Sequence, residues 1–288
     1  MIKDWIEAIR PRTLPASASP VLVAGAYGWH FDKFQPVVIG ICLVFALLAQ
    51  IASNLANDYF DFKKGIDDEH RTGPKRAVAS GTITPKAMLI ATLVTLGVAC
   101  AVGCSLIYYG GWILLPAGII IALFALAYSA GPYPLSCHGL GDLTVFIFFG
   151  LIAVDLTYYI QTGSVETMVW LGSVGIGLLS VNILLVNNYR DMENDAKAHK
   201  VTTVVMFGRQ WAELTYLVNG IAAVWVTSYE KPAIALFLIP YLIIHYFTWM
   251  EMRRKRDFEL NPVLGKTARN LLIFSLLLIF ALAIFKSA

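Results

Sequence analysis

Two groups of acidic and amide residues, far apart in the chain, have the types and spacing needed for metal chemistry. The first contains Asn54, Asp58 and Asp61, and the second contains Asp191 and Asp195. Spacings of three or four residues place each pair of aspartates on one face of a helix. Carboxylate and amide oxygens, without histidine or cysteine, are typical ligands of a hard cation, and Mg²⁺ is the first candidate.

The two groups also resemble each other in sequence. Residues 57–61 (NDYFD) align with residues 187–191 (NNYRD), so the segments 54–68 and 187–200 form a weak internal repeat. Solvated helix ends are the alternative reading, which the second copy disfavours. Each segment is accompanied by basic residues that could hold the phosphates of a metal-bound substrate. They are Lys63, Arg71, Lys75, Arg76, Lys197 and Lys200.

A diphosphate held by metal ions at the edge of a dry helical bundle points to one kind of reaction. Neutralising the leaving diphosphate weakens its C–O bond, and an allylic carbocation can form where water is excluded. The apolar tail of such a substrate would lie among the helices or in lipid.

The elements that must position these residues follow from composition. Of the 288 residues, 58% are hydrophobic and only 14% are charged, which excludes a soluble globule and a disordered chain. The apolar runs are long enough for membrane helices rather than barrel strands. We therefore expect one all-α, membrane-embedded domain over residues 1–288 with nine transmembrane helices. The expected spans are residues 14–29, 36–57, 87–109, 112–129, 143–160, 168–188, 211–228, 232–250 and 270–286.

The positive charges predict how this bundle is oriented. With the N-terminus inside, all but Lys33, Lys231 and Lys286 of the 22 lysines and arginines fall in inside segments, as the positive-inside rule requires. The C-terminus is then outside, and both acidic groups face the cytoplasm from a bacterial inner membrane. The run RRKR at residues 253–256 is interpreted as a topology signal and an anchor to anionic lipid, with a substrate site as the alternative. No nucleic-acid partner is expected.

At these residues the chain resembles the UbiA-type intramembrane aromatic prenyltransferases, and among them the 1,4-dihydroxy-2-naphthoate polyprenyltransferases of menaquinone biosynthesis. The wider resemblance rests on the strings NDYFD and YRDMEND at residues 57–61 and 189–195. The narrower one adds further strings along nearly the whole chain. They are RPRTLP at 10–15, NLANDYFDFKKG at 54–65, GPKRAV at 73–78, GPYP at 131–134, GLGD at 139–142 and NPVL at 261–264.

This resemblance implies an Mg²⁺-dependent enzyme with two substrates. A polyprenyl group would pass from polyprenyl diphosphate to dihydroxynaphthoate with loss of CO₂, giving demethylmenaquinol. The residues implied to bind magnesium and diphosphate are Asn54, Asp58, Asp61, Asp191 and Asp195, assisted by Lys63, Arg76 and Lys200. Asn188 and Arg190 belong to the second motif and are assigned to substrate binding with it.

A loop without lysine or arginine precedes the fifth expected span and suits the acceptor end of such a site. Tyr128, Tyr133 or His138 could bind or deprotonate a phenol, with plain packing as the alternative. Asp142 is either a helix N-terminal charge or an active-site base or acceptor contact. We assign Tyr133 and Asp142 to substrate binding. Asp155, the only acid within an expected span, is interpreted as lying near the interface or as protonated, with a catalytic role as the alternative.

Some features depart from the resemblance or leave other functions open. The second motif continues as AHKVT at residues 198–202, where the family usually has a string like GKRTL, so one phosphate contact is in doubt. A different aromatic acceptor is one alternative. A cation-coupled transporter is another, although coupling sites usually lie near the bilayer midplane. Phosphatidyl transfer is disfavoured because its DGxxAR string is absent.

Overall fold

Helices make up the regular structure of this chain. The computed structural model describes residues 2–65, 73 and 76–286. Proline occupies the first position of α3 (Pro36–Lys63) and of α4 (Pro85–Ser105), where a missing N–H costs nothing. Before α4, the Thr84 side chain accepts a hydrogen bond from the backbone N–H of Ala87 and caps the helix.

The other elements follow in chain order. They are α1 (Ile2–Ile9), η1 (Pro11–Thr13), α2 (Leu14–His30), α5 (Ile107–Gly110), α6 (Leu114–Ala127), η2 (Leu135–Cys137), α7 (Gly141–Val145), η3 (Phe146–Leu156), α8 (Thr157–Thr162), α9 (Thr167–Lys197), α10 (Thr203–Thr227), α11 (Ala233–Arg254), η4 (Asp257–Leu260) and α12 (Asn261–Ile284). The element η3 is a π-helix that joins α7 to α8, whereas η1, η2 and η4 are 3₁₀ turns.

The prediction of nine transmembrane helices is wrong. Over the described residues, six helical segments are long and apolar enough to cross a membrane. The expected spans 14–29 and 112–129 fall on α2 and α6, whose 17 and 14 residues are short of the ~20 that a bilayer needs. The expected span 211–228 falls on α10, which carries polar and charged residues such as Glu213 and Asn219. The expected orientation, with the N-terminus inside and the C-terminus outside, is inferred from nine spans and is no longer supported by that count.

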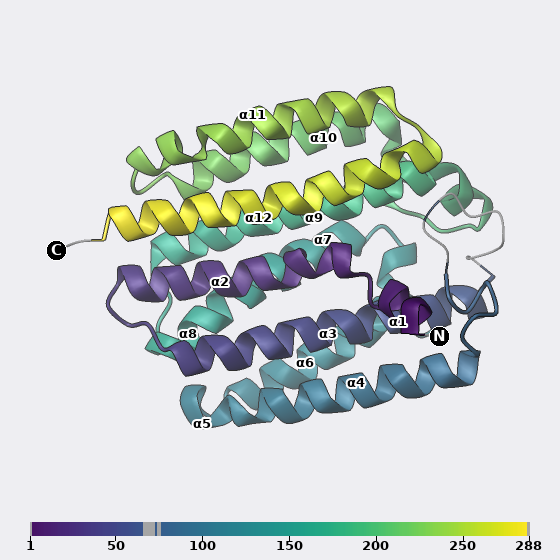
Figure 1. The fold of residues 1–288 in the computed structure, drawn as a ribbon, viewed down its shortest axis with the longest axis horizontal. Coiled ribbons are helices and arrows are strands. Elements are labelled where there is room, and N and C mark those ends of the chain that lie inside the picture. Colours follow the sequence, from purple (N-terminus) through teal and green to yellow (C-terminus); the bar gives the residue numbers. More distant parts are fainter. Residues whose placement is uncertain (1, 66–72, 74–75, 287–288) are drawn as a thin grey trace.

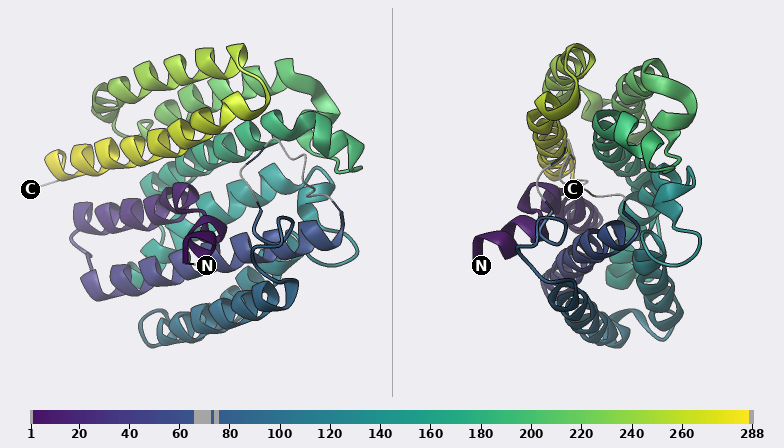
Figure 2. Two further views of the ribbon diagram at one scale, coloured as in Figure 1. Left: turned by 45° about the vertical axis from the view of Figure 1, so that its right-hand side comes forward. Right: turned by 90° about the vertical axis from the view of Figure 1, so that its right-hand side faces the viewer.

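The helices run side by side along the long axis, and the two ends of the chain lie at opposite ends of the bundle (Figure 1). Figure 2 shows α10, α11 and α12 on one side and α3, α4 and α6 on the other. Between them, α2 packs against α3 and α12, and α9 packs against α10, α12 and η3.

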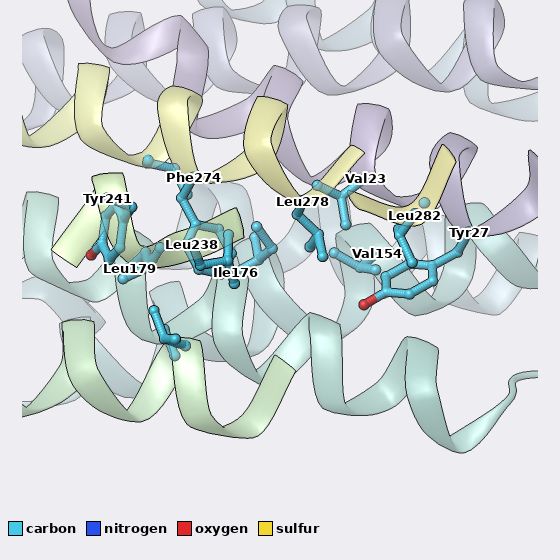
Figure 3. Close-up of a cluster of buried hydrophobic side chains, with 14 of the residues drawn as sticks. Val23, Tyr27, Val154, Ile176, Leu179, Leu238, Tyr241, Phe274, Leu278 and Leu282 are labelled. Atoms are coloured by element: carbon cyan, nitrogen blue, oxygen red, sulfur yellow. The ribbon is translucent and has the colours of Figure 1, made fainter. Parts of the chain in front are cut away.

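The hydrophobic core is centred on α9, the most buried of the six segments. Figure 3 shows the core side chains that α9 shares with its neighbours. They are Ile176 and Leu179 of α9, Val23 and Tyr27 of α2, Val154 of η3, Leu238 and Tyr241 of α11, and Phe274, Leu278 and Leu282 of α12. Glycine permits the closest contact, because a Cβ at Gly150 of η3 would lie 2.5 Å from the Cα of Gly177.

Both acidic groups lie on continuous helices at the same end of the bundle. The α3 helix continues beyond its apolar run to Lys63, and α9 continues to Lys197 (Figure 1). The fold therefore brings together two similar segments, residues 57–61 and 187–191, that are 130 positions apart in the sequence.

Candidate active site

A cavity of about 500 Å³ opens between α2, α3, α6, η3 and α9. One end is polar and charged, lined by Arg10, Asn54, Asn57, Asp61, Arg76, Asp142, Asn188, Asp191, Asp195 and Lys200. The rest is an apolar arm, lined by residues that include Val21, Cys42, Phe45, Ala46, Leu106, Phe124, Phe148, Ile152, Leu156 and Ile160. The cavity therefore suits a molecule with a polar, charged head and a long apolar tail.

Asn57 organises the charged end on the side of α3. Its Oδ1 accepts hydrogen bonds from Arg10 (2.7 Å) and Arg76 (3.0 Å). Its Nδ2 donates to Asp61 Oδ2 (2.8 Å) and to Ser129 Oγ (3.2 Å). One amide thus fixes two cations and one carboxylate in a single arrangement at the cavity wall.

The two other predicted ligands on α3 have different surroundings. The Asp58 carboxylate is buried and accepts hydrogen bonds from the backbone N–H groups of Ala77 (3.1 Å) and Val78 (3.2 Å). It does not line the cavity, and it holds the segment that carries Arg76. Asn54 does line the cavity, and its Nδ2 donates to the backbone carbonyl of Ile9 (2.9 Å).

On α9, a buried ion pair orients the second acidic group. Arg190 donates from Nε (2.8 Å) and from a terminal nitrogen (2.7 Å) to the two oxygens of Asp191. The same guanidinium donates to Asn187 and to Asn261, both at 2.9 Å. Arg190 is 2% exposed and lies behind the cavity wall rather than in it. It positions Asp191 at the cavity wall.

Asp195 and Lys200 form the remaining charged pair at the cavity. Lys200 Nζ lies 3.2 Å from Asp195 Oδ1. Burial alone would lower the pKa of Lys200, but the carboxylates of Asp195, Asp61 and Asp191 outweigh burial and raise it. The ammonium group therefore stays charged at neutral pH and can bind an anion.

The oxygen donors at the charged end suit magnesium chemically, but they are not gathered into a preformed cage. Within the described part of the chain, no three His, Cys, Asp or Glu side chains are close enough together to hold a metal ion. Instead, Asp61 is held by Asn57, Asp191 by Arg190 and Asp195 by Lys200.

Several predicted substrate residues lie away from the cavity. Lys63 is exposed at the end of α3 and does not line it. Tyr133 is 59% exposed, and its ring stacks on His138 with 3.6 Å between the ring centroids. Arg71 and Lys75 lie outside the described residues.

Sequence analysis did not single out Asn57, Arg10 or Ser129 as site residues. The strings RPRTLP and NDYFD contain Arg10 and Asn57, so the signal was present. Ser129 follows α6 and meets Asn57 only because the chain folds, across 72 residues of sequence.

Asp142 and Tyr128 line the cavity as well. Asp142 Oδ2 accepts a hydrogen bond from Thr203 Oγ1. Its Oδ1 is buried and has no hydrogen-bond partner among the described residues. Burial, with the charges of Asp142 and Asp61 nearby, raises the pKa of Tyr128, so its phenol remains protonated and can donate.

Solved structures with the same fold support this arrangement of helices. A UbiA homolog from Archaeoglobus fulgidus bound to GPP and Mg²⁺ superposes with a TM-score of 0.67 at 16% identity, covering 96% of this chain and 99% of that one. A structure of digeranylgeranylglyceryl phosphate synthase gives a TM-score of 0.60 at 16% identity and covers 98% of both chains.

Sequence relatives cover nearly the full length. The 1,4-dihydroxy-2-naphthoate octaprenyltransferase of Haemophilus influenzae is 33% identical, over 98% of this chain and 96% of its own. The enzyme of that name from Escherichia coli is 32% identical, over 98% and 95%. Human UbiA prenyltransferase domain-containing protein 1 is 30% identical, over 97% and 83%. Residues 17–274 match the UbiA prenyltransferase family as a whole, and the chain belongs to that family.

Proposed function

We propose that this protein is an integral membrane enzyme that transfers a polyprenyl group from polyprenyl diphosphate to 1,4-dihydroxy-2-naphthoate. CO₂ is lost and demethylmenaquinol is formed. The observation that carries the proposal is the single cavity in which a cluster of cations and carboxylates continues into an apolar arm. The full-length relatives named for this activity supply the identity of the acceptor.

The charged end is proposed to bind the diphosphate. Arg10 and Arg76, both held on the amide of Asn57, and Lys200 from the other wall provide three positive charges at the cavity. Arginine guanidinium groups match phosphate oxygens in geometry, and a lysine adds a point charge. These residues would hold the diphosphate while its charge increases as the C–O bond breaks.

Mg²⁺ is the proposed cofactor at the same end. Asp61, Asp191, Asp195 and Asn188 line the cavity with oxygen donors and would hold the ion. When bound, it would neutralise the departing diphosphate. Arg190 positions Asp191 for this role, and Asp58 fixes the segment of Arg76. In this proposal Asp58 contributes by positioning.

The apolar arm is proposed to hold the prenyl chain and to exclude water. Its walls include the aromatic rings of Phe45, Phe124 and Phe148. Aromatic faces carry partial negative charge and favour a nearby cation. An allylic cation formed beside the charged end would therefore be protected from hydrolysis and directed to the acceptor.

Asp142 is proposed to contact the acceptor. The hydrogen bond from Thr203 fixes one oxygen of Asp142, and the other oxygen is buried at the cavity without a described partner. That oxygen can accept the hydrogen bond of a phenolic hydroxyl. Tyr128, which remains a donor, can hold an oxygen of the same ring.

The charged end of the bundle is proposed to face the cytoplasm of a bacterial cell. Most described basic residues lie at this end, whereas Lys33, Lys231 and Lys286 lie near the termini of helices at the other. Such a charge difference is typical of the cytoplasmic side of a membrane protein.

The test uses the full chain in phospholipid vesicles with Mg²⁺, a polyprenyl diphosphate and carboxyl-labelled dihydroxynaphthoate. We expect equal amounts of prenylated quinol and labelled CO₂. Asp142→Asn is expected to reduce turnover, whereas Asp155→Asn, on the same segment but outside the cavity lining, serves as the matched control. Prenylation of a hydroxybenzoate but not of the naphthoate, or no product with either, would overturn the proposal.

A further inference from the structure

A second group of cations lies between α10 and α11, separate from the cavity described above. It forms an open hollow lined by Arg209 and Glu213 of α10, Trp249, Arg253 and Arg254 of α11, and Arg256. None of these residues lines the active-site cavity. The reaction proposed above therefore does not account for this concentration of arginines.

The hollow has an excess of positive charge. Glu213 is paired with Arg253 at 3.1 Å, and Arg209 is paired with Glu193 at 3.3 Å. Within the described part of the chain, Arg254 and Arg256 have no carboxylate partner. Both guanidinium groups are exposed, and Arg256 donates from one terminal nitrogen to the backbone carbonyls of Arg253 (2.9 Å) and Lys255 (2.7 Å). The remaining N–H groups of the two side chains favour a phosphate.

Two of the arginines, Arg253 and Arg256, are ordered by stacking on aromatic rings. Arg253 lies over the ring of Trp249 at 4.7 Å, and Arg256 lies over the ring of Tyr189 at 5.4 Å. Both rings are themselves anchored on Glu213, by the Trp249 indole N–H to its carbonyl (2.8 Å) and by the Tyr189 hydroxyl to its carboxylate (2.7 Å). Pre-ordered cations lose less conformational freedom when a ligand binds.

An exposed apolar face continues from the hollow toward the other end of the bundle. On α10 it consists of Leu214, Val218, Ile221 and Trp225, which are 50–66% exposed and share one helix face by their spacing. On α11, Phe247 and Ile243 are also exposed. Gly208, with φ of 83°, breaks α10 immediately before Arg209. Arg209 therefore lies at the start of the helical stretch that carries this exposed apolar face.

We propose that this hollow binds the phosphate headgroup of one anionic phospholipid, with the acyl chains lying along the exposed faces of α10 and α11. The cations and the adjoining apolar surface together match an amphiphile. A free phosphate would contact the cations but not the apolar surface. If these arginines only set the orientation of the protein in the membrane, they would need neither the stacking on aromatic rings nor the contribution of Arg209 from a separate helix.

The test is native mass spectrometry of the full chain, purified in detergent and titrated with phosphatidylglycerol or phosphatidylcholine of identical acyl chains. Wild-type protein is expected to bind one phosphatidylglycerol in preference to phosphatidylcholine. Arg254→Gln with Arg256→Gln removes the two unpaired, exposed cations, so phosphatidylglycerol binding should weaken by about tenfold or more.

The matched control removes the same charge from exposed residues at the same end of the bundle, by Lys3→Gln with Lys86→Gln. It is expected to keep wild-type lipid binding, and thermal unfolding of both variants checks that they are folded. Equal loss in both double variants would show diffuse attraction to the surface and overturn the proposal. Equal binding of the two lipids, or displacement of phosphatidylglycerol by millimolar inorganic phosphate, would overturn it as well.

Discussion

Asn57→Asp is a sharp perturbation of the charged end because the new side chain has nearly the same shape. The acceptor for Arg10 and Arg76 is retained. The donor to Asp61 is lost, and a second carboxylate is placed where the amide nitrogen now lies 2.8 Å from Asp61 Oδ2. We therefore expect Asp61 to move and both arginines to turn toward the new carboxylate, away from the diphosphate.

The size of the effect follows from the contact that is lost. A hydrogen bond to a charged group contributes about 1.5–3 kcal/mol. With a tenfold rate change for each 1.36 kcal/mol, kcat/KM for polyprenyl diphosphate should fall by about 10- to 150-fold. The folded state loses little stability because Arg10 and Arg76 compensate the new charge, so the thermal midpoint should shift by only about 2–4 °C.

The assay is steady-state formation of prenylated quinol at varied polyprenyl diphosphate, with thermal unfolding measured in parallel. Ser129→Ala is the companion variant, since it removes the 3.2 Å contact to the same amide and leaves Asp61 in place. It should lower kcat/KM by about tenfold at most, because the hydrogen bond is neutral. If Asn57→Asp stays within about threefold of wild type in kcat/KM, or if Ser129→Ala is the more damaging change, the reasoning fails.

Chelation of divalent ions should abolish turnover, with full recovery in Mg²⁺ and poor recovery in the larger Ca²⁺; activity that persists in chelator would refute metal dependence. Asp58→Ala leaves two buried backbone N–H groups, of Ala77 and Val78, without their acceptor, and should lower the free energy of unfolding by about 2–4 kcal/mol. Asp58→Asn keeps one acceptor oxygen and should lose less in the same denaturation experiment. Arg190→Lys keeps the charge but cannot bridge its three partners, so the KM for the diphosphate should rise by about tenfold; an unchanged KM would contradict the positioning role of Arg190.

The sequence predicted the helical class and the meeting of the two acidic groups for one physical reason. Each group directly follows a long apolar run, and apolar runs of that length must cross a hydrocarbon layer. The ends of α3 and α9 therefore had to lie at a membrane surface. Their placement at the same end of the bundle matches the charge pattern of the loops.

The number of spans could not be predicted in this way, because the apolar runs on α2 and α6 form helices that are too short and the run on α10 is interrupted by polar and charged residues. The charge on α10 is compensated by its neighbours. Glu213 is held by Arg253 of α11, and Arg209 is held by Glu193 of α9. Such residues lower the mean hydropathy of the run, so hydropathy alone does not decide whether this helix crosses the membrane. The pairing that makes the helix fit its place in the bundle depends on contacts across 16 and 40 residues of sequence.

The separate surroundings of Asp58 and Asp61 were also beyond local reasoning. Three residues of spacing place them on the same side of α3, yet Asp58 meets the backbone of Ala77 and Val78 while Asp61 reaches the cavity. The chain segment after α3 decides which of the two carboxylates it covers. Helix periodicity contains no information about that segment.

The division of the cavity into a charged end and an apolar arm also has a consequence for product inhibition. Transfer separates the head of the donor from its tail, so the two products differ completely in solubility. Inorganic diphosphate still matches every cation at the charged end and should compete with the prenyl donor. The quinol has no phosphate for those cations and can dissolve in the bilayer, so its accumulation should inhibit the enzyme only weakly. Turnover in the cell would then depend on removal of diphosphate from the water rather than removal of quinol from the membrane.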